Sequence, residues 1–249
     1  MKFGNEKYDS TALHVALVPN RDCLPIYYAK RAGIFDSLGL KVQIATYFSQ
    51  MDCDTALMGH FADGGWADKT RIAHYGKRMK ELNVMWNGSQ HWHLFSCGAL
   101  RINTIKALTG RTIAIARASA EKAWIEQILK EGHLNTEDVY YPQINNLKLR
   151  AQMLTGNQID AAVLSWPYTS LAWSEGHKCI IAQKATDTAG AFVMKSNSLK
   201  GHKDKWELFE KGRKMALDSI RLKGPNAYSI VLQKDYGLPQ PVADTIRYK

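Results

Sequence analysis

Short apolar runs alternate with amphipathic helical patterns along this chain, and the alternation occurs twice, over about residues 10–95 and about 105–185. Such alternation is typical of an α/β protein with largely parallel sheets, and its repetition favours two similar lobes over one sheet. Ser119 and Gly132 are expected to cap one helix at its two ends. The apolar patterns predict strands at 13–18, 41–47, 112–116, 160–165 and 192–195, and helices at 25–34, 52–58, 120–131 and 203–222.

Composition excludes several classes of protein. Hydrophobic residues make up 45% and charged residues 22%, values that exclude a disordered or fibrous chain. No run of 18 apolar residues is present, so we expect no transmembrane helix. The net charge is +10, but acidic residues interrupt the basic clusters at 77–80 and 200–205. We interpret the charge as solvated surface and expect no nucleic-acid partner.

The four cysteines and the amino terminus constrain the function less than the composition does. No Cys-x-x-Cys occurs among Cys23, Cys53, Cys97 and Cys179, which favours ordinary, mostly buried thiols. Residues 1–10 are polar and contain no apolar signal segment. Either the protein works in the cytoplasm, or an export signal has been removed.

Four segments carry a resemblance to a known family. They are PIYYAK…GIF…GLKV at 25–42, ALTGRTIA at 107–114, LTGNQIDAA at 154–162, and Pro167. In this order they resemble type 2 periplasmic solute-binding proteins, in the branch that binds nitrate, sulfonates, taurine and thiamine-pyrimidine precursors.

The resemblance implies a two-lobed α/β fold, type 2 periplasmic-binding-protein-like, with a ligand cleft between the lobes. By analogy the first lobe comprises residues 1–97 plus 194–249 and the second residues 98–193. The implied function is the solute-binding component of an ABC importer, which captures a small anionic or heteroaromatic molecule by hinge closure. It further implies a membrane permease as partner, a monomer, no cofactor, and a periplasmic or lipid-anchored location.

In the first lobe, the expected ligand contacts follow strand ends, where open α/β sheets bind their ligands. Asn20 could instead cap the following helix, and Trp66 could stack on a flat ligand or be a core residue. The candidates are Asn20, Leu24, Ser49, Gln50, Trp66 and Asp68.

In the second lobe, Ser119 and the amides after it would suit an oxyanion, with Arg117 supplying charge. His91 and His93 lie on one face of a strand, as a metal site requires, but we favour hydrogen bonding to ligand or backbone. The candidates at the first crossover, in the second lobe and near the return crossover are His91, Trp92, Arg117, Ser119, Trp166, Tyr168 and Thr188.

An enzyme of the same fold is the alternative, similar to thiamine-pyrimidine synthases or menaquinone-pathway lyases. Cys97 stands alone where those synthases have a cysteine-dense segment, and no nucleophile–base pair is visible at meaningful spacing. We therefore expect a binding protein without catalytic residues.

Overall fold

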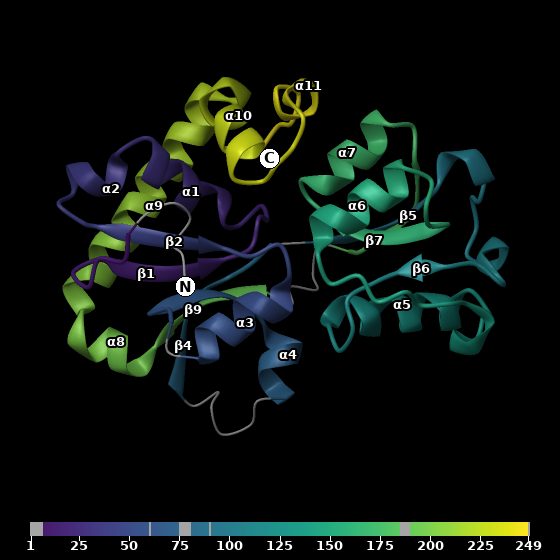
Figure 1. Cartoon of the computed structure of the whole chain (residues 1–249), viewed down its shortest axis with the longest axis horizontal. Helices are drawn as coiled ribbons and strands as arrows, with labels where there is room; N and C mark the ends of the chain where they lie inside the picture. Colours follow the sequence, from purple (N-terminus) through teal and green to yellow (C-terminus); the bar gives the residue numbers. More distant parts are fainter. Residues whose placement is uncertain (1–6, 60, 75–80, 90, 185–189, 249) are drawn as a thin grey trace.

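The computed structural model describes residues 7–59, 61–74, 81–89, 91–184 and 190–248, which form two α/β lobes (Figure 1). The strands are β1 (Leu13–Leu17), β2 (Val42–Thr46), β3 (Gly64–Asp68), β4 (Leu82–Asn87), β5 (Trp92–Ser96), β6 (Ile113–Ala114), β7 (Ala161–Ser165), β8 (Lys178–Ala182) and β9 (Gly190–Lys195). The α-helices are α1 (Leu24–Arg31), α2 (Ile34–Ser37), α3 (Gln50–Met58), α4 (Lys69–His74), α5 (Ala120–Glu131), α6 (Leu147–Thr155), α7 (Tyr168–Ser174), α8 (Ser196–Gly201), α9 (Lys203–Lys223), α10 (Pro225–Lys234) and α11 (Gln240–Ala243).

The first lobe is built on a five-stranded sheet in the order β2-β1-β3-β9-β4. Helices α1 and α9 cover one face and α3 and α4 the other (Figure 1). Helix α9 forms because its apolar residues recur at helical spacing, and Trp206 and Phe209 are fully buried against Phe35 and Phe192. These rings anchor the core of the first lobe.

The second lobe is built on a four-stranded sheet in the order β6-β7-β5-β8. Helix α5 lies on one face, and α6 and α7 lie on the other (Figure 1). Ser119 caps α5 as predicted, since its side chain accepts a hydrogen bond from the Lys122 amide at 3.3 Å. Gly132 ends the helix, and Ile125 and Leu129 on its inner face are fully buried.

The prediction of largely parallel sheets is wrong. Strand β1 is parallel to β2 and β3, and β6 is parallel to β7. Strand β9 is antiparallel to β3 and β4, and β5 is antiparallel to β7 and β8. The reason is topological: β5 and β9 are the strands with which the chain enters one sheet after leaving the other, and they run against their neighbours.

The crossings also lie elsewhere than the expected lobe limits. The limits at 97/98 and 193/194 place β5 with the first lobe and most of β9 with the second. The strand pairing joins β5 to the second sheet and β9 to the first. The chain therefore changes lobes between β4 and β5, and again between β8 and β9.

Two further expectations can be compared with the structure. Cys23, Cys53 and Cys97 are buried free thiols and Cys179 is a partly buried one, as predicted. In the part of the chain that the structure describes, no helix combines the length and apolarity that crossing a membrane requires.

Candidate ligand-binding site between the lobes

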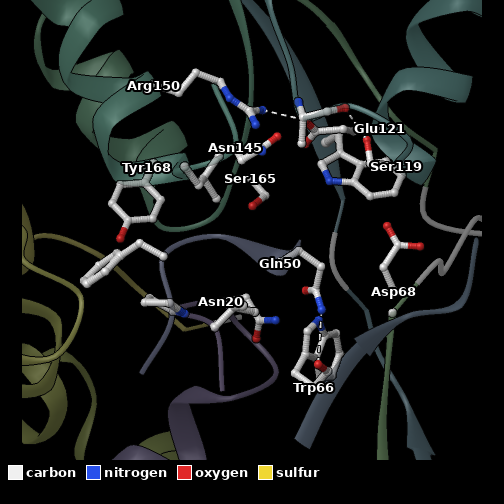
Figure 2. Close-up of a pocket in the computed structure, with 17 residues that line it drawn as sticks. Asn20, Gln50, Trp66, Asp68, Ser119, Glu121, Asn145, Arg150, Ser165 and Tyr168 are labelled. Atoms are coloured by element: carbon white, nitrogen blue, oxygen red, sulfur yellow. Dashed lines mark hydrogen bonds and ion pairs between the residues drawn. The ribbon is translucent and has the colours of Figure 1, made fainter. Parts of the chain in front are cut away.

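A pocket lies between the two lobes, and residues from both line it (Figure 2). It encloses about 720 Å³ including its opening to solvent. The lining residues are Val18, Pro19, Asn20, Phe48, Gln50, Trp66, Asp68, Trp92, Ala116, Ser119, Glu121, Asn145, Leu147, Arg150, Ser165, Tyr168 and Gly190.

Asn20 presents a hydrogen-bond donor that the protein does not use. It follows β1, and its Oδ1 accepts a hydrogen bond from the Cys23 amide at 2.8 Å, just before α1. The residue is 1% exposed, and its Nδ2 is buried without a hydrogen-bond partner. A buried donor without a partner is costly, so this amide is a candidate for contact with a bound ligand or water.

Trp66 forms an aromatic wall of the pocket from β3. Its indole occupies a slot between two glycines, because a Cβ on Gly88 or Gly190 would lie 2.2 or 2.3 Å from ring atoms. The Gln50 side chain donates a hydrogen bond to the Trp66 carbonyl at 3.1 Å and thereby joins the start of α3 to β3. The ring is 2% exposed, so the slot fixes its position.

Asp68, at the end of β3, reaches across the pocket to the amino end of α5. One carboxylate oxygen accepts hydrogen bonds from the amides of Thr70 and Arg71, at 2.8 and 3.2 Å. The other oxygen accepts a hydrogen bond from the Ala120 amide of the second lobe at 3.2 Å. Burial raises the pKa of Asp68, although these amides oppose the shift.

Glu121 and Arg150 form a buried ion pair on the second-lobe side, with 2.8 Å between Oε1 and Nη1 (Figure 2). The Glu121 carboxylate also accepts a hydrogen bond from the Ala116 amide. Burial raises the pKa of Glu121, and Arg150 opposes the shift. The Arg150 guanidinium donates in addition to the carbonyls of Ile144 and Val163. Protein atoms therefore hold this cation in place.

The lobes contact each other on several sides of the pocket. The Leu147 amide donates to the Phe48 carbonyl at 2.9 Å. Arg71 donates from Nη1 to the carbonyls of Arg117 and Ala118, at 3.2 and 3.1 Å. These bonds join backbone and side chains of opposite lobes directly.

The structure brings together more than half of the residues expected from the sequence. Asn20, Gln50, Trp66, Asp68, Trp92, Ser119 and Tyr168 all line the pocket. Ser119 combines this place with its capping role, and Tyr168 is 1% exposed.

The other expected residues lie away from the pocket lining. Leu24 is fully buried in the core of the first lobe, and Ser49 is the buried N-cap of α3. Arg117 is exposed on the turn before α5. Trp166 packs edge-on against Tyr236 and Tyr248. Thr188 lies outside the described residues.

His91 and His93 also lie outside the pocket lining. Among the described residues the buried Nδ1 of His91 has no hydrogen-bond partner, and the His93 ring lies edge-on to Trp173. Burial, with His91 nearby, lowers the pKa of His93. Among the described residues no group of three metal-ligating side chains gathers around this pair or elsewhere.

The residues expected from the sequence do not include Phe48, Glu121, Asn145 and Arg150. The cap of α6 is Asn146, whose side chain accepts from the Leu149 amide at 3.0 Å, and this leaves Asn145 in the pocket. Glu121 could have been predicted to lie near the ligand, because it follows Ser119 in the first turn of a helix that begins at a strand end. No local pattern in the sequence predicts the place of Arg150, since its partner Glu121 is distant in sequence.

Comparison with known protein families identifies the family of this chain. The family model described as NMT1/THI5 like matches residues 20–204, well over half of the chain. No curated protein matches the chain in sequence.

The fold is similar to that of solved solute-binding proteins. The alkanesulfonate-binding protein SsuA from Xanthomonas axonopodis pv. citri, bound to MOPS, superposes with a TM-score of 0.76 at 15% identity over 96% of this chain and 83% of that one. The aliphatic sulphonate-binding protein SsuA from Escherichia coli gives 0.71 at 14%, over 94% and 81%. The nitrate-binding protein NrtA from Synechocystis gives 0.74 at 12%, over 93% and 68%.

Proposed function

Because the chain belongs to the NMT1/THI5-like family, we propose that it is the solute-binding component of an ABC importer. The observation that carries the proposal is the pocket between the lobes, to which both lobes contribute polar and aromatic side chains. The named sulfonate- and nitrate-binding proteins of the same fold support it.

The lining of the pocket suits a small organic molecule. Trp66, Trp92, Phe48 and Tyr168 provide aromatic surface, and Asn20 provides a buried donor. Flat heteroaromatic molecules combine a ring that packs on such surfaces with acceptor atoms at the ring edge. The pocket lining contains no histidine or cysteine among the described residues, and we assign it no catalytic role.

The contacts between the lobes support a closing motion on ligand binding. Ligand would bind to one lobe, and the other lobe would then form the bonds from Leu147 to Phe48 and from Arg71 to Arg117 and Ala118. A ligand that contacts both lobes favours this closed arrangement over an open one. We propose that the closed protein, as a single chain outside the inner membrane, is the form that a membrane permease binds.

A thermal-shift screen against sulfonates, nitrate, pyrimidines, amino acids and aromatic carboxylates tests this function. A ligand at about 100 times its dissociation constant adds about 2.7 kcal/mol to the free energy of unfolding. We expect hits from one chemical class, recovered unchanged by mass spectrometry, and a smaller radius of gyration by X-ray scattering when the hit is bound.

Two outcomes would contradict the proposal. A hit that is recovered chemically altered would indicate an enzyme. Scattering curves that superimpose with and without a tight ligand would show that the lobes do not close on it.

A further inference from the structure

The amino end of α5 faces the pocket and is the place where an anion would be expected. The end of a helix leaves backbone amides without partners and carries a partial positive charge. The helix is twelve residues long, and its cap Ser119 lines the pocket. An anionic ligand bound between lobes would gain most from this position.

Asp68 already fills that position from the other lobe. Its Oδ2 accepts the Ala120 amide, while its Oδ1 is held by the amides of Thr70 and Arg71. The carboxylate is thus fixed at both ends, and Figure 2 shows it below Ser119 and Glu121, between β3 and α5. A second anion at this helix end would meet both the lost bond and the repulsion between like charges.

Two arginines near the pocket are paired with carboxylates. Arg150 pairs with Glu121, and Arg71 pairs with Asp54 at 2.6 Å between Nε and Oδ2. Together with Asp68, these side chains comprise three carboxylates and two guanidinium groups. With all five ionised this group carries −1, so these side chains do not attract an anion to the amino end of α5.

Asn20 supplies an independent indication of what the pocket does accept. Its buried Nδ2 has no partner in the part of the chain that the structure describes and lies on the first-lobe side of the pocket (Figure 2). This donor requires an acceptor such as a ring nitrogen or a carbonyl oxygen. An uncharged ligand can offer that acceptor without bringing a negative charge toward Asp68.

We propose that Asp68 acts as an internal counterion for α5 and makes the pocket select uncharged or cationic flat molecules with an edge acceptor, against anions. The inference rests on the proposed function, because it assumes that this pocket is the ligand site. Asp68 is then a specificity-determining residue, and Asn20 is the group that orients the ligand.

Calorimetric titration of the purified protein tests the selection with four probes: 4-aminopyrimidine, nicotinamide, methanesulfonate and inorganic phosphate. We expect the wild type to bind at least one heterocycle and to bind both anions at least about tenfold more weakly, a difference of about 1.4 kcal/mol. In Asp68→Ser the charge is removed while a hydroxyl remains to cap α4. This variant should gain at least about tenfold in affinity for methanesulfonate or phosphate.

Two variants serve as controls for charge and for the donor. Asp52→Asn removes one exposed carboxylate from α3, outside the pocket lining, and should leave all four affinities unchanged. Asn20→Asp keeps the acceptor for Cys23 but removes the donor, and should weaken heterocycle binding about tenfold.

The results separate this inference from the proposed function. A wild type that binds methanesulfonate or phosphate as tightly as the heterocycles would keep the importer function and overturn the selection. An Asp68→Ser variant that gains no anion affinity would overturn it as well; if that variant does not fold, Asp68→Asn is titrated in its place. A wild type that binds no solute in the broader thermal-shift screen would instead contradict the importer function.

Discussion

The hydroxyl of Tyr168 donates a hydrogen bond to the backbone carbonyl of Tyr236 at 2.9 Å, and so joins α7 of the second lobe to the segment after α10. The Tyr236 hydroxyl in turn donates to the Asn20 carbonyl at 2.7 Å. A chain of two phenols therefore connects the second lobe to the first-lobe wall of the pocket. Burial raises the pKa of both phenols, so both remain donors at neutral pH.

Replacing Tyr168 by Phe should weaken this connection. The change removes one donor and leaves the buried Tyr236 carbonyl without it, at a cost of about 1–2 kcal/mol in the free energy of unfolding. Urea denaturation measures this difference. Tyr140→Phe, at a phenol that is 67% exposed, is the matched control and should be neutral. Equal stability of the two variants would contradict the role of the bond.

Gly190→Ala should move Trp66. The added methyl would lie 2.3 Å from the indole Cζ2, so the ring must leave its slot or the strand must shift. We expect ligand affinity to fall at least about tenfold, measured by calorimetry with any hit from the screen. Gly201→Ala adds the same methyl where no atom lies within 4 Å and should retain affinity. Full affinity in Gly190→Ala would show that the position of Trp66 does not matter for binding.

Ala118→Gly should stabilise the protein. Ala118 has a φ of 49°, in the left-handed region, on the turn whose carbonyl accepts from Arg71. This conformation costs a residue with a Cβ about 1–2 kcal/mol, of which the greater chain entropy of glycine cancels part. We expect a gain of about 0.5–1 kcal/mol in chemical denaturation. Ala123→Gly, on the exposed face of α5, should have the opposite sign.

The ion pair of Asp54 and Arg71 should give stability a defined dependence on pH. Burial raises the pKa of Asp54 to about 6 from 3.8, against the hydrogen bonds from Gln50 and Arg71. The folded state then binds the proton more tightly than the unfolded state, so this contribution to stability is complete below about pH 4 and is lost as the pH rises through about 6.

Asp54→Asn removes that titration, and comparison with the wild type isolates it. The difference in unfolding free energy, wild type minus variant, should decrease between about pH 4 and pH 6, as measured by urea denaturation at several pH values. A difference that increases over this range would mean that the attraction of Arg71 outweighs burial and that the pKa is lowered.

Local signals in the sequence predicted the elements of the fold well. The cap Ser119, the closing Gly132 and the buried face of α5 depend on residues within one helix, so their pattern can be read directly. The segment 64–68 was not among the predicted strands, yet it is a full strand whose glycines pack closely against β1 and Trp206. That packing involves residues far away in sequence.

The same distinction explains which parts of the site could be predicted. Asn20, Gln50, Asp68 and Ser119 follow strands at the sheet edge, where the topology of α/β folds places ligands. Arg150 and its bond to Glu121 depend on how α6 packs against α5, and no local pattern encodes that. The charge of the pocket was therefore the property that the sequence left open, and the sequence predicted an anionic or a heteroaromatic ligand without distinguishing the two.

The order in which the strands enter the two sheets also affects synthesis. The strands β5 to β8 of the second lobe lie within residues 92–182, whereas β4 pairs at the edge of the first sheet with β9, which begins at Gly190. On the ribosome, the second lobe emerges with its strands complete while β3 and β4 still present open edges. Open strand edges pair readily with other chains. The lobe that holds the amino terminus is thus the last to finish, and it is the part of a nascent chain that depends most on protection by chaperones.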